Sequence, residues 1–388
     1  MEKLCNTELC TGCGACAAVC PANCIRMERD TEGFLQPVVD QQACIGCSRC
    51  QKACPILNPL PRDPGGTIAC AAINKDEAVR LHSTSGGVFS LLCRWVLDRR
   101  GVIFGAAYDE DFQVIHCQVD CAEDLHKLRC AKYAQSSLGD TFSRVKRLLA
   151  EERYVLFSGT PCQVGGLLSY LGKSHEKLIL VDLVCHGVPS PGVWQHYMDY
   201  RSSQDAGGQK PVRINLRSKE TGWPGYSILF EYPDGQRYSA PNSQDPYLRG
   251  FVGNLYLRAS CYHCRFKGIA RQSDFTLADY WGVWSQLPAY HDGKGTSLVL
   301  MHSGKARSIW KDLSSEMHVF QVDPAQSLEE NASALTAPPC PPARAAFFSR
   351  YETEDFTDLV ETLYPRPVVK KRTVLDRALG KIRRILHI

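Results

Sequence analysis

Residues 10–21 read CTGCGACAAVCP and residues 44–55 read CIGCSRCQKACP, so the pattern C-x2-C-x2-C-x3-C-P occurs twice. This spacing lets one loop direct three thiolates at a cubane 4Fe-4S cluster, while the fourth cysteine reaches the cluster of the other copy. We therefore predict two clusters, the first bound by Cys10, Cys13, Cys16 and Cys54 and the second by Cys44, Cys47, Cys50 and Cys20.

Zinc knuckles are the main alternative, because Cys-x2-Cys pairs also bind zinc. Zinc needs four ligands per site, which gives no reason for a third cysteine, a three-residue gap and a proline to recur together. A formal match to the dinucleotide fingerprint at residues 12–17 is not preceded by a strand pattern and is interrupted by cysteines. We predict a ferredoxin-like domain over residues 1–56, with Cys5 and Cys24 as small buried hydrophobes.

The composition limits the class of protein. The chain has 388 residues, 20 cysteines and a net charge of +4. A cysteine-rich chain could be a secreted disulfide scaffold, but residues 1–5 contain no apolar signal segment and cluster thiolates need a reducing compartment. No apolar run approaches the roughly 20 residues that span a bilayer. We therefore expect a cytoplasmic protein, and the small net charge does not indicate nucleic-acid binding.

A second, larger domain is expected after a linker. Residues 57–66 are rich in proline and glycine, which predicts a stiff, extended linker. From residue 67 onward strand-like and helix-like patterns alternate, which indicates a mixed α/β domain over residues 67–340. The expected strands are 67–73, 101–107, 154–157, 178–184, 212–216 and 226–232, and the expected helices are 87–100, 164–171 and 191–201.

Two segments of this domain have side chains suited to a cofactor. Residues 83–87, with the sequence STSGG, lead into an apolar helix, and hydroxyls and glycines at a helix N-terminus can bind a phosphate. An ordinary helix cap is the alternative. Residues 130–137 offer a cation, an aromatic ring and an amide ahead of another helix. Neither segment is decisive by itself.

Four more cysteines occupy positions that indicate a common site. Cys162 begins a predicted helix, Cys185 follows a predicted strand, and Cys261 and Cys264 form a Cys-x2-Cys pair. Adjacent strand ends share one edge of a sheet, so we predict a third 4Fe-4S cluster on these four residues. The alternatives are a zinc site, inert thiols, or Cys162 as a nucleophile with His186 as its base. The remaining cysteines of the large domain are expected to be inert: Cys70, Cys93, Cys117, Cys121, Cys130 and Cys340.

Six motifs in a fixed order are more informative together. They are residues 83–89 (STSGGVF), 132–136 (KYAQS), 159–163 (GTPCQ), 182–190 (DLVCHGVPS), 261–266 (CYHCRF) and 273–282 (SDFTLADYWG). On these motifs the chain resembles the coenzyme F-420 hydrogenase/dehydrogenase beta-subunit family, in the bacterial form with a fused N-terminal two-cluster ferredoxin domain. The resemblance covers roughly residues 1 to 300.

The resemblance implies an iron-sulfur flavoprotein oxidoreductase that binds FAD, exchanges a hydride at the flavin and passes single electrons to 4Fe-4S clusters. An additional cluster in some members agrees with the third site. Arg217 and Lys219 lie in a segment that is similar to a family segment near the cofactor. No catalytic acid or base is assigned, and His186 is the only candidate. Carried over by position, the flavin-site residues are Ser83, Thr84, Ser85, Gly86, Gly87, Lys132, Tyr133, Gln135, Ser136, Thr160 and Gln163.

The expected fold class is α+β, with a small N-terminal bacterial-ferredoxin-like domain, a larger mixed α/β flavin-binding domain and a helical C-terminal tail. The expected partner is a ferredoxin-like protein, an enzyme subunit or deazaflavin, and the fold does not name the substrate. A non-catalytic electron-relay subunit and a cluster-bearing interaction protein are the alternatives. The oligomeric state is open.

The tail covers residues 341–388. Residues 343–363 have a helical pattern, and residues 370–388 form a basic amphipathic pattern with apolar side chains on one face. Such a helix can dock on its own domain or on a partner. The other interpretation is peripheral contact with an anionic membrane surface.

Overall fold

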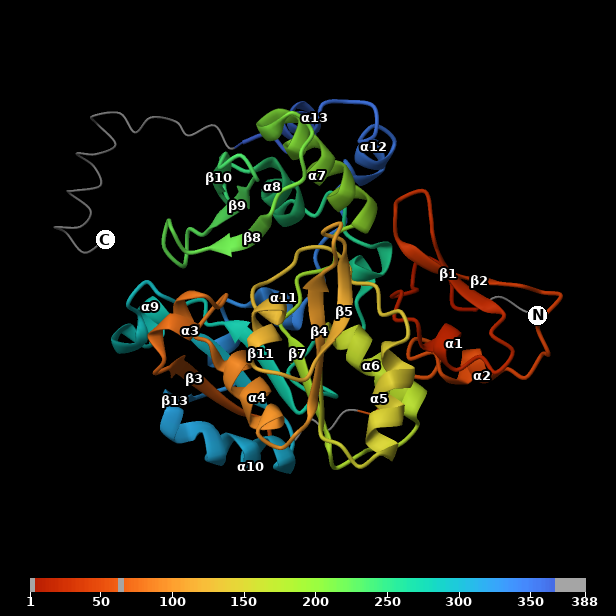
Figure 1. Ribbon diagram of the computed structural model, residues 1–388, viewed down its shortest axis with the longest axis vertical. Coiled ribbons are helices and arrows are strands. Elements are labelled where there is room, and N and C mark those ends of the chain that lie inside the picture. Colours follow the sequence, from red (N-terminus) through yellow and green to blue (C-terminus); the bar gives the residue numbers. More distant parts are fainter. Residues whose placement is uncertain (1–3, 62–65, 367–388) are drawn as a thin grey trace, which may run out of the picture.

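A computed structural model of the protein describes residues 4–61 and 66–366. The N-terminal module lies at one side of the molecule (Figure 1, red) and contains one antiparallel strand pair with two short helices. Gly14 and Ser48 adopt left-handed backbone conformations immediately before these helices, which lets the chain curl there. The elements are α1 (Ala15–Ala18), β1 (Ile25–Arg29), β2 (Leu35–Val39) and α2 (Arg49–Lys52).

The large domain is built on an eight-stranded mixed sheet with the order β13-β3-β12-β11-β7-β6-β4-β5. The four central strands β4, β6, β7 and β11 are parallel, and the outer strands are antiparallel. This confirms the expected mixed sheet. The strands are β3 (Ile68–Asn74), β4 (Val102–Tyr108), β5 (Val114–Val119), β6 (Val155–Ser158), β7 (Leu178–Leu183), β11 (Phe275–Asp279), β12 (Ser297–Met301) and β13 (Met317–Val322).

Helices cover both faces of this sheet. Successive strand residues point to opposite faces, so Leu156 packs against α4 and α10 while Val155 and Phe157 pack against α5 and α6. Burial on both faces explains why β4, β6 and β7 are nearly continuous apolar runs in the sequence. The helices are α3 (Glu77–Leu81), α4 (Val88–Leu97), α5 (Thr141–Ala150), α6 (Pro161–Leu171), α9 (Val283–Gln286), α10 (Gly304–Leu313) and α11 (Ala332–Leu335).

Short 3₁₀ helices complete the large domain. They are η1 (Glu123–Leu128), η2 (Ala259–His263), η3 (Pro288–Tyr290), η4 (Ser314–Glu316) and η5 (Gln326–Leu328). None of the helices in residues 4–61 and 66–366 is both long and apolar enough to cross a membrane.

A lobe above the sheet contains a three-stranded antiparallel sheet with helices packed on it (Figure 1). Its core is aromatic and includes Trp194, Tyr247 and Phe356. The expected helical stretch 343–363 forms two short helices that pack into this core, whereas residues 370–388 lie outside the described part of the chain. The elements are α7 (Pro191–Ala206), β8 (Arg213–Ser218), β9 (Ser227–Glu231), β10 (Arg237–Pro241), α8 (Pro246–Val252), α12 (Arg344–Phe348) and α13 (Phe356–Leu363).

The N-terminal module packs directly against the rest of the protein. Arg344 forms a two-pronged ion pair with Glu32, and the Ser190 hydroxyl donates to the Glu32 carbonyl. A Cβ atom on Gly33 would lie 2.6 Å from the Gly192 Cα, so the two backbones can approach only because both residues are glycine. This contact holds the cysteine repeats against the large domain.

Candidate cofactor site

A cavity of about 600 Å³ opens where the parallel strands end. Ser158, Leu183 and Asp279, which end strands β6, β7 and β11, all line it. Ligands of open α/β sheets bind at this edge, because the loops that follow the strands enclose a crevice there. The cavity lies between the sheet and the upper lobe, which contributes Arg217 and Phe251 to its walls.

One wall is the loop before α4. Gly87 caps this ten-residue helix with a φ of 85°, so the amides of its first turn lie at the cavity. The Thr84 hydroxyl accepts from the Ala131 amide at 3.0 Å, which ties the loop to the segment 129–134 on the facing wall. Gly86 does not line the cavity, and a Cβ on it would lie 2.4 Å from the Ala72 carbonyl oxygen of β3.

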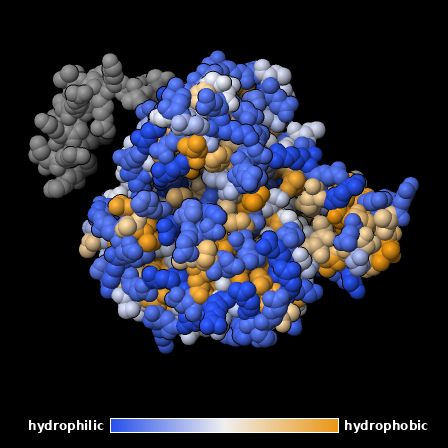
Figure 2. Space-filling view, in the orientation of Figure 1, coloured by the Kyte–Doolittle hydropathy of each residue, from blue (hydrophilic) through white to orange (hydrophobic). Residues whose placement is uncertain are grey.

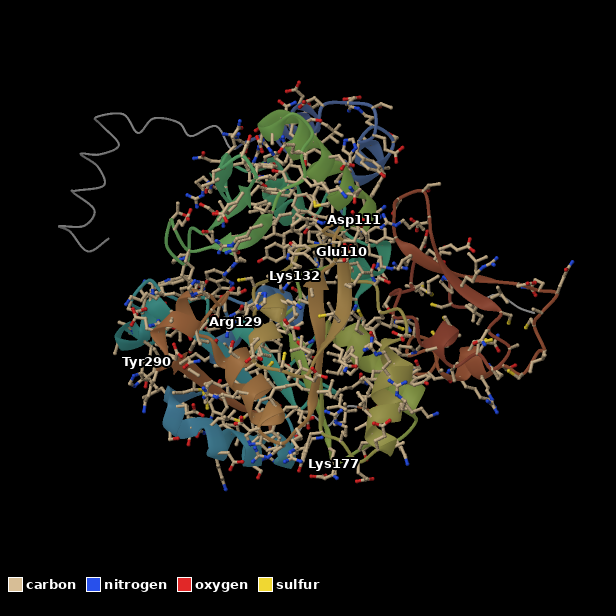
Figure 3. All side chains as sticks on the ribbon, viewed as in Figure 1. Glu110, Asp111, Arg129, Lys132, Lys177 and Tyr290 are labelled. Atoms are coloured by element: carbon tan, nitrogen blue, oxygen red, sulfur yellow. The ribbon has the colours of Figure 1, made fainter. Side chains whose placement is uncertain are left out.

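Cations line the same cavity. Figure 3 shows Arg129 and Lys132 in the middle of the molecule, between the upper lobe and the sheet. The Lys132 ammonium donates to the carbonyls of Lys127 at 2.9 Å and Arg129 at 2.7 Å, and burial lowers its pKa to about 8. Arg217 is buried and pairs with Asp279 at 2.7 Å. The positive charges of Arg129 and Lys132 favour an anionic ligand in this cavity.

The other predicted residues of this region have separate roles. Gln163 donates to the Ser136 hydroxyl at 2.9 Å, and both residues line the cavity with Thr160. Tyr133 lines the cavity too, and its ring stacks on Phe251 with 4.7 Å between centroids. The structure therefore brings all of the predicted flavin-site residues to one cavity except Gly86 and Gln135.

Gln135 faces the N-terminal module. Its amide nitrogen donates to the Thr11 carbonyl at 2.9 Å, and its amide oxygen accepts from Arg258 at 3.0 Å. The motif KYAQS therefore divides its side chains between the cavity and the module. The sequence pattern alone does not show this, because the side chains of an irregular segment do not alternate in direction with a regular period.

Several lining residues were not assigned to the flavin site from the sequence, although Trp281 belongs to one of the six motifs. Arg129 lines the cavity from the end of η1, and Trp281 lines it from the segment after β11. His116 of β5 lines it as well, and burial lowers the pKa of its imidazole to about 4. Strands β5 and β11 were not expected as strands, so the convergence of their ends on this site could not be predicted. The available signals were Val114, Ile115 and Val119 in β5 and Phe275 and Leu277 in β11, which are strand-favouring or apolar residues.

The four cysteines predicted for a third cluster line a second, smaller cavity. Burial, together with the neighbouring thiols, raises the pKa of Cys185 and Cys261 to about 12. The Val188 amide donates to the Cys261 sulfur at 3.4 Å. Segments far apart in the sequence meet here: the start of α6, the end of β7 and η2. The four thiols are Cys162, Cys185, Cys261 and Cys264.

Cations also surround this second cavity. Arg258, Lys267 and Arg271 all line it. The Nε atom of Arg271 is buried and has no hydrogen-bond partner among residues 4–61 and 66–366. A 4Fe-4S cluster held by four thiolates is anionic and accepts hydrogen bonds at its sulfurs. The donor set, the cations and the unpaired Nε therefore fit such a group.

The first predicted ligand set of the N-terminal module lines a third cavity. Cys5 lines it too, although it lies outside the repeats. Burial raises the pKa of Cys13 to about 11, and the neighbouring Cys10 contributes. The ligand set that faces this cavity is Cys10, Cys13, Cys16 and Cys54.

The second ligand set lies in the apolar core of the module. Cys20, Cys44 and Cys50 pack together there, and the charges of Cys20 and Cys47 raise the pKa of Cys50 in addition to its burial. Cys24 was expected to be a simple buried hydrophobe, but its sulfur lies 3.4 Å from that of Cys20. Cys47 is exposed.

Two family models match the chain. Residues 9–57 match the 4Fe-4S dicluster domain, and residues 152–327 match the C terminus of the coenzyme F420 hydrogenase/dehydrogenase beta subunit. Residues 152–327 therefore carry the C-terminal domain of this beta subunit family, and residues 9–57 carry a dicluster domain. This confirms the family indicated by the six motifs, and the dicluster domain implies two 4Fe-4S clusters.

A solved structure is also similar to this chain. A chain from the F420-reducing [NiFe] hydrogenase complex of Methanosarcina barkeri, studied by xenon derivatization, aligns with a TM-score of 0.45 and 15% identity. The alignment covers 72% of this chain and 99% of that chain. No curated protein matches the sequence.

The two family ranges relate differently to the cavities. The cysteines of the second cavity all lie within 152–327 and those of the repeats within 9–57, whereas residues 83–87 and 132–136 lie outside both.

No group of three or more histidine, cysteine or carboxylate side chains in the described ranges is placed to hold a single metal ion.

His186 lines both the large and the four-cysteine cavity. Its Nε2 lies 2.6 Å from the Asn254 amide oxygen and its Nδ1 lies 3.2 Å from the Ser333 hydroxyl. Burial lowers the pKa of the imidazole, so it is neutral near pH 7. Because both nitrogens have hydrogen-bond partners, the ring is held in one orientation.

Proposed function

We propose that this chain is an iron-sulfur flavoprotein oxidoreductase that connects a two-electron carrier to a one-electron carrier. When bound, FAD supplies hydride exchange and 4Fe-4S clusters supply single-electron exchange. The observation that supports this function is the contiguity of the three cavities. Cys185, His186, Gly187 and Val188 line both the large and the four-cysteine cavity, and Thr11 lines both the four-cysteine cavity and that of the first ligand set.

The large cavity suits a dinucleotide that carries both phosphates and an aromatic ring. The loop 83–87, Arg129 and Lys132 would hold the phosphates, because free helix amides and cations that line a cavity bind anions. Tyr133 and Trp281 offer aromatic faces in the same cavity. Residues 185–188 form the wall next to the four cysteines, so a ring placed there would be close to the third cluster site.

The four-cysteine cavity is the proposed site of the third cluster, with Cys162, Cys185, Cys261 and Cys264 as its ligands. Cys13 of the first ligand set lies close to this site, because a Cβ on Gly166 of α6 would lie 2.9 Å from the Cys13 sulfur. The small residue at 166 therefore allows the module to approach α6 next to Cys162.

A redox partner would contact the outer end of the module, beside the second ligand set. Cys47 is exposed there, and the neighbouring Ile45 has 68% of its surface exposed. Figure 2 shows apolar side chains on this module at the right of the molecule. A ferredoxin-like carrier or a partner subunit is the proposed occupant, and deazaflavin is the alternative two-electron partner at the large cavity.

A relay subunit without turnover of its own is the second candidate. It is favoured by the family itself, whose matched model describes a beta subunit. Turnover by the isolated chain separates the two functions. The proposed domain limits are 1–56, 57–66, 67–340 and 341–388, and the proposed compartment is the cytoplasm.

The test is anaerobic purification followed by iron, acid-labile sulfide and flavin quantitation on one sample. We expect about twelve irons and about one FAD per chain, because each of three sites holds a cube of four irons. About eight irons without flavin would contradict the proposal and leave only the dicluster domain in place.

A further inference from the structure

Arg258 lies where the N-terminal module meets the four-cysteine cavity. Only 1% of its surface is exposed. It immediately precedes η2, which carries Cys261, and its side chain lines the four-cysteine cavity together with Thr11. The residue therefore touches the surroundings of two proposed cluster sites at once.

The guanidinium of Arg258 donates its hydrogen bonds to neutral oxygens. Its Nε donates to the Cys10 carbonyl at 2.6 Å, and its Nη2 donates to the Leu35 carbonyl at 3.0 Å. Its Nη1 donates to the Gln135 amide oxygen at 3.0 Å. A Cβ on Gly12 would lie 2.7 Å from Nη1, so the loop of the first ligand set wraps closely over this cation.

Buried arginines away from the four-cysteine cavity have carboxylate partners. Arg80 pairs with Asp292 at 2.6 Å and Arg217 pairs with Asp279 at 2.7 Å. Within the described ranges no such ion pair involves Arg258. A buried charge without a counter-charge is costly in free energy. The charge of Arg258 therefore requires a nearby anion, and no carboxylate of the described residues pairs with it.

Cube clusters ligated by four thiolates supply this negative charge. Their charge becomes more negative by one when an electron is added, with no bond made or broken, and net charge sets their reduction potentials. A buried cation acts strongly across a low-dielectric interior. It therefore stabilises the reduced cluster more than the oxidised one and raises the potential.

We propose that Arg258 is a positioning residue that supplies the shared positive charge between the first cluster of the module and the third cluster, holding the module in place and raising both reduction potentials. This inference rests on the proposed function. The ligands of the second cluster line neither the four-cysteine cavity nor that of the first ligand set, so this cluster serves as an internal reference.

The test is a redox titration of the intact anaerobic protein followed by electron paramagnetic resonance. Gln135→Glu places a carboxylate against the guanidinium and compensates its charge without removing it, and it also loses the amide hydrogen bond to the Thr11 carbonyl. We expect this variant, and Arg258→Met, to lower the midpoint potentials of the first and third clusters by about 59 mV, which is about tenfold in a one-electron equilibrium. The potential of the second cluster should stay unchanged.

Two controls define the outcome. Arg258→Lys keeps the charge and should restore most of both potentials. Arg271→Met should lower only that of the third cluster, because Arg271 donates to the Phe266 and Ala334 carbonyls, whereas Arg258 donates to the Cys10 carbonyl in the loop of the first ligand set. Cys47→Ser identifies the signal of the second cluster. If Arg258→Met loses its clusters, Gln135→Glu still decides the question.

Unchanged potentials in Gln135→Glu at full iron content would overturn the inference. An equal shift of all three potentials would overturn it too, because a local charge does not act equally on the distant cluster. Iron near eight in the unmodified protein would instead show that the proposed function fails, and this is measured before any titration.

Discussion

The thiols of Cys5 and Cys24 lie outside the two cysteine repeats, yet each lies beside a ligand set. Cys5 lines the cavity of the first set, and the hydrogen bond with Cys20 raises the pKa of Cys24 to about 11. The spacing of the repeats nevertheless makes Cys20 the expected ligand, because the x3 gap and the following proline belong to the cluster-binding loop.

At the residue scale, the predicted ligand assignment is tested by a matched pair of variants. We expect Cys20→Ala to lose about four irons per chain, because a cube needs four thiolates, and Cys24→Ala to lose none. Iron quantitation after anaerobic purification measures both. If Cys20→Ala keeps its iron and the double variant with Cys24→Ala loses it, Cys24 can act as the ligand.

At the element scale, the module is joined to the large domain by a close backbone contact between the β1–β2 turn and the start of α7. Gly33 has a φ of 81° and no room for a Cβ, whereas Gly235 in the β9–β10 turn has a φ of 83° and open space. Comparing alanine substitutions at the two positions therefore distinguishes the cost of a left-handed backbone from the cost of steric crowding.

We expect Gly33→Ala to destabilise the protein by about 2 kcal/mol more than Gly235→Ala. Both substitutions impose left-handed strain of about 1 kcal/mol, but only the first also forces Gly192 away. Thermal unfolding of the two variants measures the difference. Equal destabilisation would show that the module is not held by this contact.

At the scale of the whole molecule, stability should depend on pH through buried histidines. Burial lowers the pKa of His116 to about 4 and that of His302 to about 3, from the ordinary value of 6.5. Because the unfolded chain binds more protons than the folded one below pH 6.5, stability is full above that pH and falls as the pH drops toward these values.

We expect each histidine to remove about 1 kcal/mol of unfolding free energy between pH 6.5 and pH 5.5. Urea unfolding of the intact protein at both pH values measures this. His116→Phe should make the dependence shallower, and the exposed His318→Gln should leave it unchanged. A slope that His116→Phe does not alter would contradict the prediction.

The sequence alone determined the dicluster module, the family and the mixed sheet. These follow from short-range signals: a cysteine spacing matched to one cube, ordered motifs, and apolar strand runs between helices. Most of the residues that the resemblance assigns to a flavin site line the large cavity. These signals can be read from the sequence because each depends on residues that lie only a few positions apart in the chain.

Only the tertiary structure decided which sites adjoin. Gln135 and Arg258 are far apart in the sequence, and both turn toward the module, where the Cys10 and Thr11 carbonyls accept their hydrogen bonds. Strand β11 brings Asp279 to the cavity by pairing with the distant strand β7, and β5 brings His116 there from its hairpin with β4. The physical reason is that burial, charge compensation and strand order depend on packing between distant segments, and no local pattern encodes them.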